Sequence, residues 1–241
     1  RSAIEAAAAA FGSWSKTTAH ARSAILYKAW QLMLERKEDL ARTMTLEQGK
    51  PLRAATTEVQ YAADFLLWFA EEAKRSYGET IPSARADQRF IVSHYPVGVV
   101  AAITPWNYPV SMITRKVGPA LAAGCTVVLK PAEATPLCAI KVFEILTEAG
   151  LPDGVINLVT TSNPAPVGEE FVSNPLVRKL TFTGSTAVGK MLAGKAAGNM
   201  KRVSCELGGH APFLVFDDAD PVHAAKGVQL VKFLNTGQAC I

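Results

Sequence analysis

Apolar positions in the first third of the chain recur with the spacing of helices. Alanine-rich residues 2–11 predict one helix, and residues 17–45 predict a second, longer one. Gly49 and Pro51 follow as a stop-and-start pair, because glycine commonly ends a helix and proline is accepted at its first position. The helix that Pro51 opens extends to about Ser76, and we interpret its aromatic stripe as core.

After Gly78 the pattern changes to short extended segments. Residues 79–95 predict a hairpin around a polar turn near Ala86 and Asp87. Strands are then predicted at Val97–Ile103, Thr126–Lys130, Val155–Val159, Lys179–Phe182, Arg202–Glu206 and Pro212–Phe216. Helices are predicted at Val110–Ala123, Pro136–Ala149, Pro166–Ser173, Ser185–Ala197 and Pro221–Leu234. Because strands with continuous apolar runs alternate with helices, we predict an α/β protein with a doubly wound parallel sheet and additional N-terminal helices.

Composition excludes several classes of protein. The chain has 241 residues, of which 49% are apolar, so it is not a disordered chain. Its longest apolar stretch, Val117–Leu129, contains Gly118, Pro119 and Gly124 and falls short of the roughly 20 residues that a membrane-spanning helix needs. The net charge of +4 is spread along the chain. We therefore expect neither a membrane nor a nucleic acid as partner.

The four cysteines, Cys125, Cys138, Cys205 and Cys240, lack the paired spacing of metal ligands. A chain of this length and apolar content does not need disulfide bonds to hold its core together. Residues 6–11 are too few for the apolar region of a signal peptide. We therefore expect no metal site and a cytoplasmic location.

Ligands of doubly wound sheets bind beyond the C-terminal ends of the strands, and polar turns are predicted at those positions here. Asn107 lies in a bend held by two prolines, where its amide either donates to an oxyanion or caps the next helix. Lys130 and Glu133 follow the next strand. They fit either the hydroxyls of a ribose or an exposed ion pair.

Two later turns carry further candidates. Gly184 permits a close backbone approach, and Ser185 either caps an ordinary helix or lets the helix N-terminus meet a phosphate, although the GxGxxG fingerprint is absent. Glu206 leads directly into two glycines, which is a poor place for a structural acid. Cys240 follows a polar turn and is either a thiolate nucleophile or an inert thiol, whereas Cys125 and Cys138 are expected in the core.

The candidate residues belong to five short motifs that follow one another along the chain. The stretches that contain them are Ile103–Asn107, Leu129–Glu133, Phe182–Ser185, Glu206–Gly209 and Asn235–Cys240. Jointly they resemble the NAD(P)-dependent aldehyde dehydrogenase superfamily over the whole length of the chain. The resemblance implies the Rossmann-like fold of that superfamily, with a hairpin used for oligomerisation.

The same resemblance implies a covalent mechanism. In this family the cysteine at the position of Cys240 attacks the aldehyde as a thiolate, and the Asn107 amide with the N–H of Cys240 holds the oxyanion. Hydride passes to the nicotinamide and leaves a thioester, which water activated by Glu206 hydrolyses to the acid. The residues implied to contact the dinucleotide are Thr104, Pro105, Trp106, Lys130, Pro131, Ala132, Glu133, Gly184, Ser185 and Leu207. Glu133 further favours NAD, while NADP stays possible.

For the substrate, residues 112–125 and 174–186 look like the succinate-semialdehyde dehydrogenase branch. By that likeness Arg115 would meet the distal carboxylate of succinate or glutarate semialdehyde, unless it is simply a surface residue of its helix. Leu234 stands where the branch usually has a second arginine, so a longer or less acidic semialdehyde, or a neutral aldehyde, stays open. Two further functions also stay open: a CoA-acylating enzyme, which Glu206 disfavours, and a dinucleotide-binding protein without catalysis.

The resemblance also suggests how the chain is divided. We expect residues 1–80 to be the helical part of the NAD-binding domain, 81–96 an oligomerisation hairpin, 97–209 the NAD-binding α/β domain and 210–241 the start of a catalytic domain. The likeness covers only the N-terminal half of such proteins, which we expect to form homodimers or homotetramers. A polypeptide of these 241 residues alone is expected to lack robust turnover and to associate through exposed strand edges.

Overall fold

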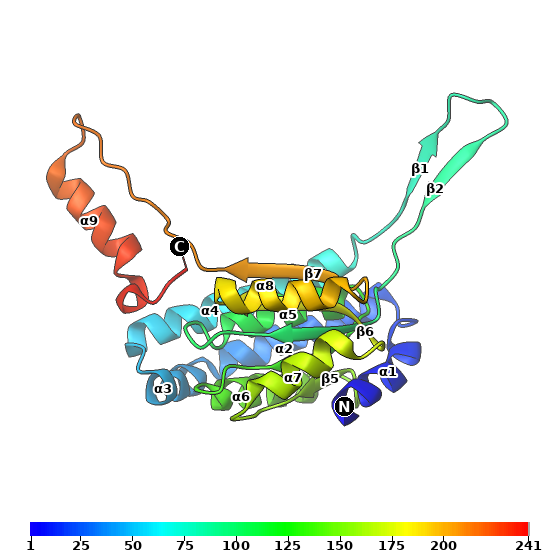
Figure 1. Cartoon of the computed structure of the whole chain (residues 1–241), viewed down its shortest axis with the longest axis horizontal. Coiled ribbons are helices and arrows are strands. Elements are labelled where there is room, and N and C mark those ends of the chain that lie inside the picture. Colours follow the sequence, from blue (N-terminus) through cyan, green and yellow to red (C-terminus); the bar gives the residue numbers. More distant parts are fainter. Residues whose placement is uncertain (241) are drawn as a thin grey trace.

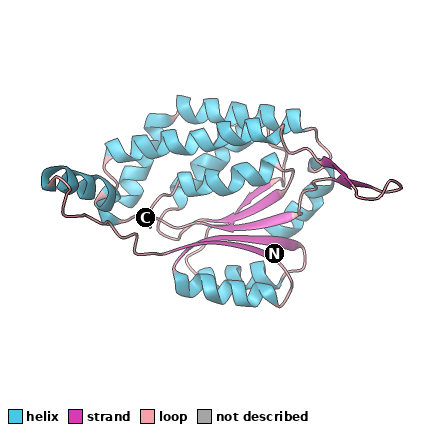
Figure 2. Ribbon diagram, turned by 90° about the horizontal axis from the view of Figure 1, so that it is seen from above, coloured by secondary structure: helices cyan, strands magenta, loops and turns pink. Residues whose placement is uncertain are grey.

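The computed structural model describes residues 1–240 and is built around a five-stranded parallel sheet (Figures 1 and 2). Its spatial order is β5-β4-β3-β6-β7. The strands are β3 (Val99–Ile103), β4 (Thr126–Lys130), β5 (Ile156–Leu158), β6 (Val177–Gly184) and β7 (Arg202–Leu207). The chain adds strands outward from β3 in one direction and then returns to add β6 and β7 on its other side. This reversal between β3 and β6 is the position where doubly wound sheets bind ligands.

Helices cover both faces of this sheet, as Figure 2 shows. The helices are α1 (Ser2–Trp14), α2 (Ala19–Glu35), α3 (Lys37–Gln48), α4 (Leu52–Ala73), α5 (Ser111–Ala122), α6 (Pro136–Glu148), α7 (Pro164–Ser173), α8 (Thr186–Ala197) and α9 (Pro221–Lys232), with the short 3-10 turn η1 (Leu234–Gly237). Val100 and Ala102 of β3 pack in the core that contains α2 to α6, and Val99 and Ala101 pack with α1, α7 and α8. The strand is buried on both faces because successive side chains point in opposite directions.

The N-terminal helices differ from the prediction in three places. The aromatic stripe of α4 is not core throughout, because Tyr61 and Trp68 are exposed. The first helix runs on to Trp14, because the Gly12 backbone stays helical. The predicted helix over 17–45 is two helices, α2 and α3, separated at Arg36, whose φ of −101° and ψ of 18° interrupt the helical backbone. Apolar spacing does not mark this break, because buried positions continue on both sides of it. Gly49 ends α3 as predicted, and its backbone takes the left-handed conformation that glycine favours.

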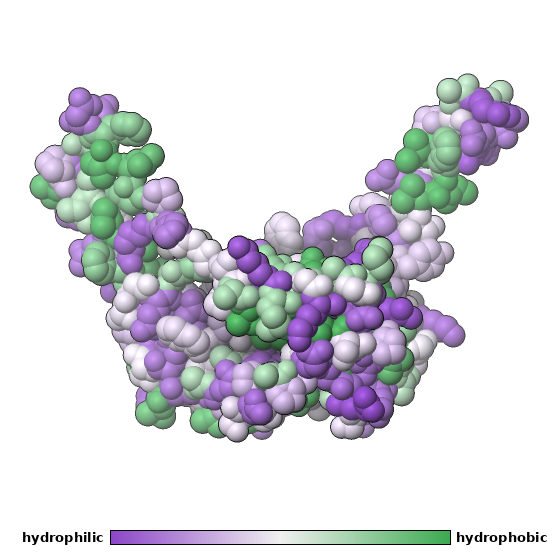
Figure 3. Space-filling model, in the orientation of Figure 1, coloured by the Kyte–Doolittle hydropathy of each residue, from purple (hydrophilic) through white to green (hydrophobic). Residues whose placement is uncertain are grey.

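A two-stranded antiparallel hairpin projects from the body of the molecule, as the sequence predicts (Figure 1). It consists of β1 (Glu79–Pro82) and β2 (Arg89–Val92), with Ile81 opposite Phe90. Every residue of both strands is exposed, including Ile81, Phe90 and Ile91, and Figure 3 shows apolar residues along the arm. The hairpin therefore presents apolar side chains and open strand edges to solvent.

The prediction of a strand at Pro212–Phe216 is wrong for this structure. The segment has no regular structure and its side chains are largely exposed, Leu214 and Phe216 among them. A strand needs a partner for its backbone hydrogen bonds, and none of the described residues supplies one. The segment leads to α9, which carries no buried residue and stands apart from the sheet (Figure 1). Among the described residues, no helix is both long and apolar enough to cross a membrane.

Candidate active site

The C-terminal ends of β3, β4 and β6 meet at a cleft of about 450 Å³. Eight of the ten residues assigned to the dinucleotide line it: Thr104, Pro105, Trp106, Lys130, Ala132, Glu133, Gly184 and Ser185. Leu207 lines a neighbouring cleft, and Pro131 lies between Lys130 and Ala132 without lining either. Helices α7 and α8 supply the opposite wall through Gly168, Glu169 and Leu192, among others.

Gly184 and Ser185 bring the start of α8 close to the sheet. A Cβ at Gly184 would lie only 2.6 Å from the Phe182 ring, so the close approach needs a glycine. Ser185 is the N-cap of α8, and its Oγ accepts a hydrogen bond from the Val188 N–H at 3.4 Å. The cap is thus present, and the N–H groups of the first helical turn border the cleft.

Lys130 and Glu133 form an ion pair at the edge of the same cleft. Lys130 is buried and also donates to the carbonyl oxygen of Pro131 at 2.8 Å, whereas 41% of the Glu133 side chain is exposed. Partial burial works against ionisation of Glu133, but its hydrogen bond from Lys130 prevails and lowers its pKa. A carboxylate therefore faces the cleft, with its lysine partner held behind it.

A second cleft, of about 180 Å³, adjoins the first and is lined by Asn107, Glu206 and Cys240. These side chains come from the turn after β3, from β7 and from the segment after η1. Trp106, Gly184 and Ser185 line both clefts, so the two are continuous along one wall. Cys240 is exposed, whereas Cys125 and Cys138 are buried, and burial raises the pKa of both buried thiols. Among the described residues that line the two clefts, the one cysteine is Cys240, which the sequence singled out from its polar turn.

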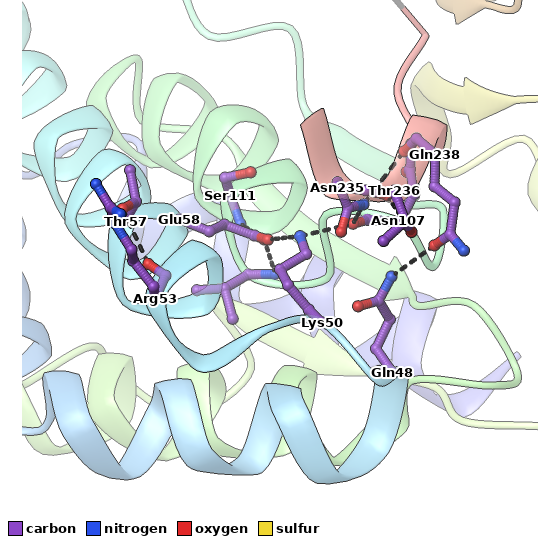
Figure 4. A network of polar contacts seen from close by, with 11 residues as sticks. Gln48, Lys50, Arg53, Thr57, Glu58, Asn107, Ser111, Asn235, Thr236 and Gln238 are labelled. Carbon is purple, nitrogen blue, oxygen red and sulfur yellow. Dashed lines mark hydrogen bonds and ion pairs between the residues drawn. The ribbon is translucent and has the colours of Figure 1, made fainter. Parts of the chain in front are cut away.

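Asn107 and the segment that carries Cys240 are tied together by hydrogen bonds (Figure 4). The Asn107 amide nitrogen donates to the Gln238 carbonyl oxygen at 3.0 Å, and the buried Asn235 amide donates to the Asn107 carbonyl oxygen at 3.0 Å. Asn235 and Thr236 have positive φ angles of 50° and 57°, which residues other than glycine rarely adopt. Backbone strain of this kind collects at functional sites and persists only where surrounding contacts hold it.

Arg115 lines neither cleft. It lies on α5 one turn after Met112, which does line the smaller cleft, and its Nη2 donates to the Tyr61 hydroxyl at 2.9 Å. Its guanidinium also lies 5.1 Å from the centre of the Phe65 ring. Leu234 opens η1 and is exposed. Arg115 therefore lies one helical turn from Met112, a residue of the smaller cleft.

Comparison with known proteins decides what kind of protein this is. The model of the aldehyde dehydrogenase family matches residues 1–241. The chain belongs to the aldehyde dehydrogenase family. It is 57% identical over 241 residues to a succinate-semialdehyde dehydrogenase of Escherichia coli named for NADP(+), and 56% identical to a glutarate-semialdehyde dehydrogenase of Pseudomonas aeruginosa. All of this chain and 50% of each relative are covered.

Solved structures agree with this assignment. The crystal structure of an E. coli NADP-dependent enzyme superposes on this chain with a TM-score of 0.97 at 57% identity. The match covers the whole of this chain and 50% of the chain of that enzyme. The chain thus spans about half the length of the relatives it matches. The aldehyde dehydrogenase fold that the motifs indicate is confirmed, including the parallel sheet and the helices on both of its faces.

The larger cleft fits the dinucleotide that family membership implies. Gly184 lets the start of α8 pack against Phe182 at the cleft, and the N-terminus of α8 offers backbone N–H groups to a phosphate. Glu133 presents a carboxylate of the type that accepts hydrogen bonds from ribose hydroxyls. Among the described residues no cluster of histidine, cysteine or acidic side chains could hold a metal ion.

Three buried groups around the site escaped the sequence analysis. Lys116 of α5 is buried, and its Nζ donates to Thr181 Oγ1 at 3.0 Å. Burial, opposed by the charge of Glu206, lowers the pKa of Lys116 to about 8. Lys50 and Glu58 form a buried ion pair behind the Asn107 turn. Lys116 and Glu58 lie within largely apolar helices and Lys50 lies between Gly49 and Pro51, but the sequence did not show what these charges would contact.

Proposed function

We propose that this chain is part of an enzyme that oxidises a carboxylated semialdehyde, such as succinate or glutarate semialdehyde, to the acid with reduction of NAD(P). The observation that carries the proposal is the cleft where Asn107, Glu206 and Cys240 meet, although 133 positions along the chain separate the first from the last. That cleft opens onto the one assigned to the dinucleotide. Relatives named as succinate- and glutarate-semialdehyde dehydrogenases support the substrate class.

In the first half-reaction Cys240 acts as nucleophile. Its sulfur forms a bond to the aldehyde carbon, and the oxygen becomes an oxyanion that accepts hydrogen bonds from the Asn107 amide and the Cys240 N–H. The Asn107 amide carries two N–H groups, so one can stay on the Gln238 carbonyl while the other meets the oxyanion. Bound NAD(P) supplies the hydride acceptor. Loss of the hydride leaves an acyl group on the Cys240 sulfur as a thioester.

In the second half-reaction Glu206 acts as general base. It takes a proton from water, the water oxygen bonds to the thioester carbon, and the carbon–sulfur bond breaks to return Cys240 as thiolate. Glu206 lies at the end of β7 and lines the same cleft as Cys240, which is what this role requires. Asn107 again stabilises the oxyanion that forms.

For the nucleotide, we propose that the residues around the larger cleft bind it and that Glu133 sets the choice between its two forms. A carboxylate that bonds to ribose hydroxyls repels a 2′-phosphate and favours NAD. Lys130 behind it carries the opposite charge, and the E. coli relative is named for NADP(+). Both nucleotides are therefore tested in the experiment below.

For the substrate, we propose Arg115 as the residue nearest to a distal carboxylate. Leu234 supplies no charge where the branch usually carries a second arginine, so we expect only a shallow preference for the four-carbon semialdehyde.

For the division of the chain, we propose a helical part of the NAD-binding domain (residues 1–80), an oligomerisation hairpin (81–96), the NAD-binding α/β domain (97–209) and the start of a catalytic domain (210–241). The exposed hairpin supports a homodimer or homotetramer of the intact enzyme, and the free thiols at all four cysteines suit a reducing compartment such as the cytoplasm.

Steady-state kinetics of the intact gene product test this proposal. The substrates are succinate semialdehyde, glutarate semialdehyde and a neutral aldehyde of similar length, each with NAD and with NADP, and each with and without CoA. We expect nucleotide reduction and a free carboxylic acid without CoA, and no turnover for Cys240→Ser. A folded protein that reduces neither nucleotide with any aldehyde would refute the proposal. Strict dependence on CoA would replace hydrolysis by acyl transfer.

A further inference from the structure

The ion pair between Lys50 and Glu58 lies behind the Asn107 turn and has no part in the chemistry described above. Lys50 follows α3, Glu58 belongs to α4, and each side chain is 1% exposed. Burial lowers the pKa of Lys50 despite the attraction of Glu58. Charges are costly to bury unless every hydrogen bond is satisfied, so a fully buried pair is better evidence of a fixed geometry than of added stability.

Both partners bond to the short segment that joins β3 to α5. Glu58 Oε1 accepts hydrogen bonds from the backbone N–H groups of Val110 and Ser111, at 3.0 and 3.1 Å. Lys50 Nζ donates to the other Glu58 oxygen and to the Asn107 carbonyl oxygen, the latter at 2.8 Å. Lys50 also lies 3.9 Å from the centre of the Tyr108 ring. The pair thus holds the segment at Asn107 and again at the start of α5.

The same network continues to Gln238 in the segment that leads to Cys240, and Figure 4 shows it as far as Gln238. The Asn107 carbonyl oxygen accepts from both Lys50 and Asn235, which occupies its two lone pairs. The Asn107 amide donates to the carbonyl oxygen of Gln238, two residues before Cys240. Lys50 and Glu58 line neither cleft, so they reach the reacting atoms only through Asn107.

We propose that Lys50 and Glu58 are positioning residues that hold the Asn107 amide in the direction needed to stabilise the oxyanion formed at Cys240. The inference rests on the proposed function. An oxyanion donor accelerates a reaction only if it already points to where the charge develops. A displacement of about 1 Å caused by a distant change can cost about 10²-fold in rate. The pair is suited to prevent such a displacement because it fixes the backbone on both sides of Tyr108.

The test variant is the double substitution Lys50→Met with Glu58→Gln in the intact gene product. Methionine has a length similar to that of lysine, and the glutamine oxygen can still accept from Val110 and Ser111, so no unpaired charge stays buried. We expect a folded protein with kcat lowered about 10²-fold, the size that a misplaced group of about 1 Å produces. The KM for the nucleotide is expected to stay unchanged, because the nucleotide is assigned to the other cleft.

Arg22→Met provides a matched control. Arg22 is also buried, and its Nε donates to the Ala122 carbonyl oxygen at 2.9 Å, at the opposite end of α5. The substitution Arg22→Met is expected to lower thermal stability and to leave kcat unchanged. If Arg22→Met and the Lys50/Glu58 variant lower kcat to the same extent, the pair acts only through the stability of α5 and the proposal is wrong.

A double-mutant cycle with Asn107→Ala separates the inference from the proposed function. Removal of one oxyanion donor lowers kcat by about 10²–10³-fold, and we expect this for Asn107→Ala. If Lys50 and Glu58 act through that amide, their substitution causes no further loss in the Asn107→Ala background. Additive losses would overturn the positioning role alone. A wild-type kcat for Asn107→Ala would instead overturn the oxyanion role in the proposed function.

Discussion

Replacement of Lys116 by methionine is expected to stabilise the protein at neutral pH and to lose this advantage in alkaline solution. The Lys116 side chain is buried and bonds to Thr181. Its burial lowers the pKa from 10.5 to about 8, with the charge of Glu206 acting in the opposite direction. The unfolded chain therefore binds a proton at this position more tightly than the folded chain does, and keeping Lys116 charged costs folding free energy.

The size of this cost follows from the shift in pKa. A fall of about 2.5 units corresponds to about 3 kcal/mol at neutral pH, because each unit is worth about 1.4 kcal/mol. Between pH 8 and 10.5 the unfolded state binds more protons at Lys116, so the stability of the parent protein rises with pH across this window. Loss of the hydrogen bond to Thr181 costs about 1 kcal/mol at either pH, so Lys116→Met should gain about 2 kcal/mol near pH 7.

Urea unfolding of the parent and of Lys116→Met at about pH 7 and about pH 10 measures this directly. Other titrating groups contribute equally to both proteins, so they cancel in the difference between the two free energies of unfolding. From the lower to the higher pH, this difference should change by about 2–3 kcal/mol in favour of the parent. Thr181→Val keeps the lysine and removes its acceptor, so it should be less stable than the parent at both pH values and retain the parent's pH dependence. A difference for Lys116→Met that is equal at both pH values would refute the reasoning.

Two further substitutions, Glu133→Ala at the larger cleft and Leu234→Arg in η1, have expected outcomes. Glu133→Ala removes the carboxylate that repels a 2′-phosphate and leaves Lys130 to attract one, so kcat/KM with NADP relative to NAD should rise at least about tenfold, or about 1.4 kcal/mol. An unchanged ratio in steady-state kinetics would remove Glu133 from nucleotide selection. Leu234→Arg adds a charge-assisted hydrogen bond worth about 1.5–3 kcal/mol, so succinate semialdehyde should gain about 10–100-fold in kcat/KM over a neutral aldehyde of similar length. Equal changes for both aldehydes would place Leu234 outside the substrate pocket.

The sequence predicted the sheet and the turns of the site because both depend on local signals. Thr126–Lys130 contains the apolar run Val127–Leu129 and has the same bounds in the structure, and Lys130 stands at its C-terminal end as expected. Parallel strands place such ends on one edge of the sheet, so the motifs after β3, β4 and β6 had to come together. The prediction that Cys125 and Cys138 lie in the core holds for the same local reason, since both lie within mostly apolar stretches.

The parts that the sequence did not predict depend on contacts between distant segments. Arg36 breaks a helix whose apolar spacing continues across it. Pro212–Phe216 has the composition of a strand but lacks a neighbour, among the described residues, with which to pair. The link from Lys50 to Asn107 spans 57 positions, and no periodic pattern connects them. Polar networks of this kind become visible only when the fold places their members side by side.

A mass measurement on Glu206→Gln tests most directly whether Asn107, Glu206 and Cys240 act on one aldehyde carbon. The variant keeps Cys240 and Asn107 but lacks the base that activates water, so reaction with semialdehyde and NAD(P) should stop at the thioester. We predict one acyl adduct per chain, located on the peptide that contains Cys240 and absent from the Cys240→Ser variant. A folded Glu206→Gln protein that binds the nucleotide but shows no adduct on Cys240, or carries it on another cysteine, would contradict the account.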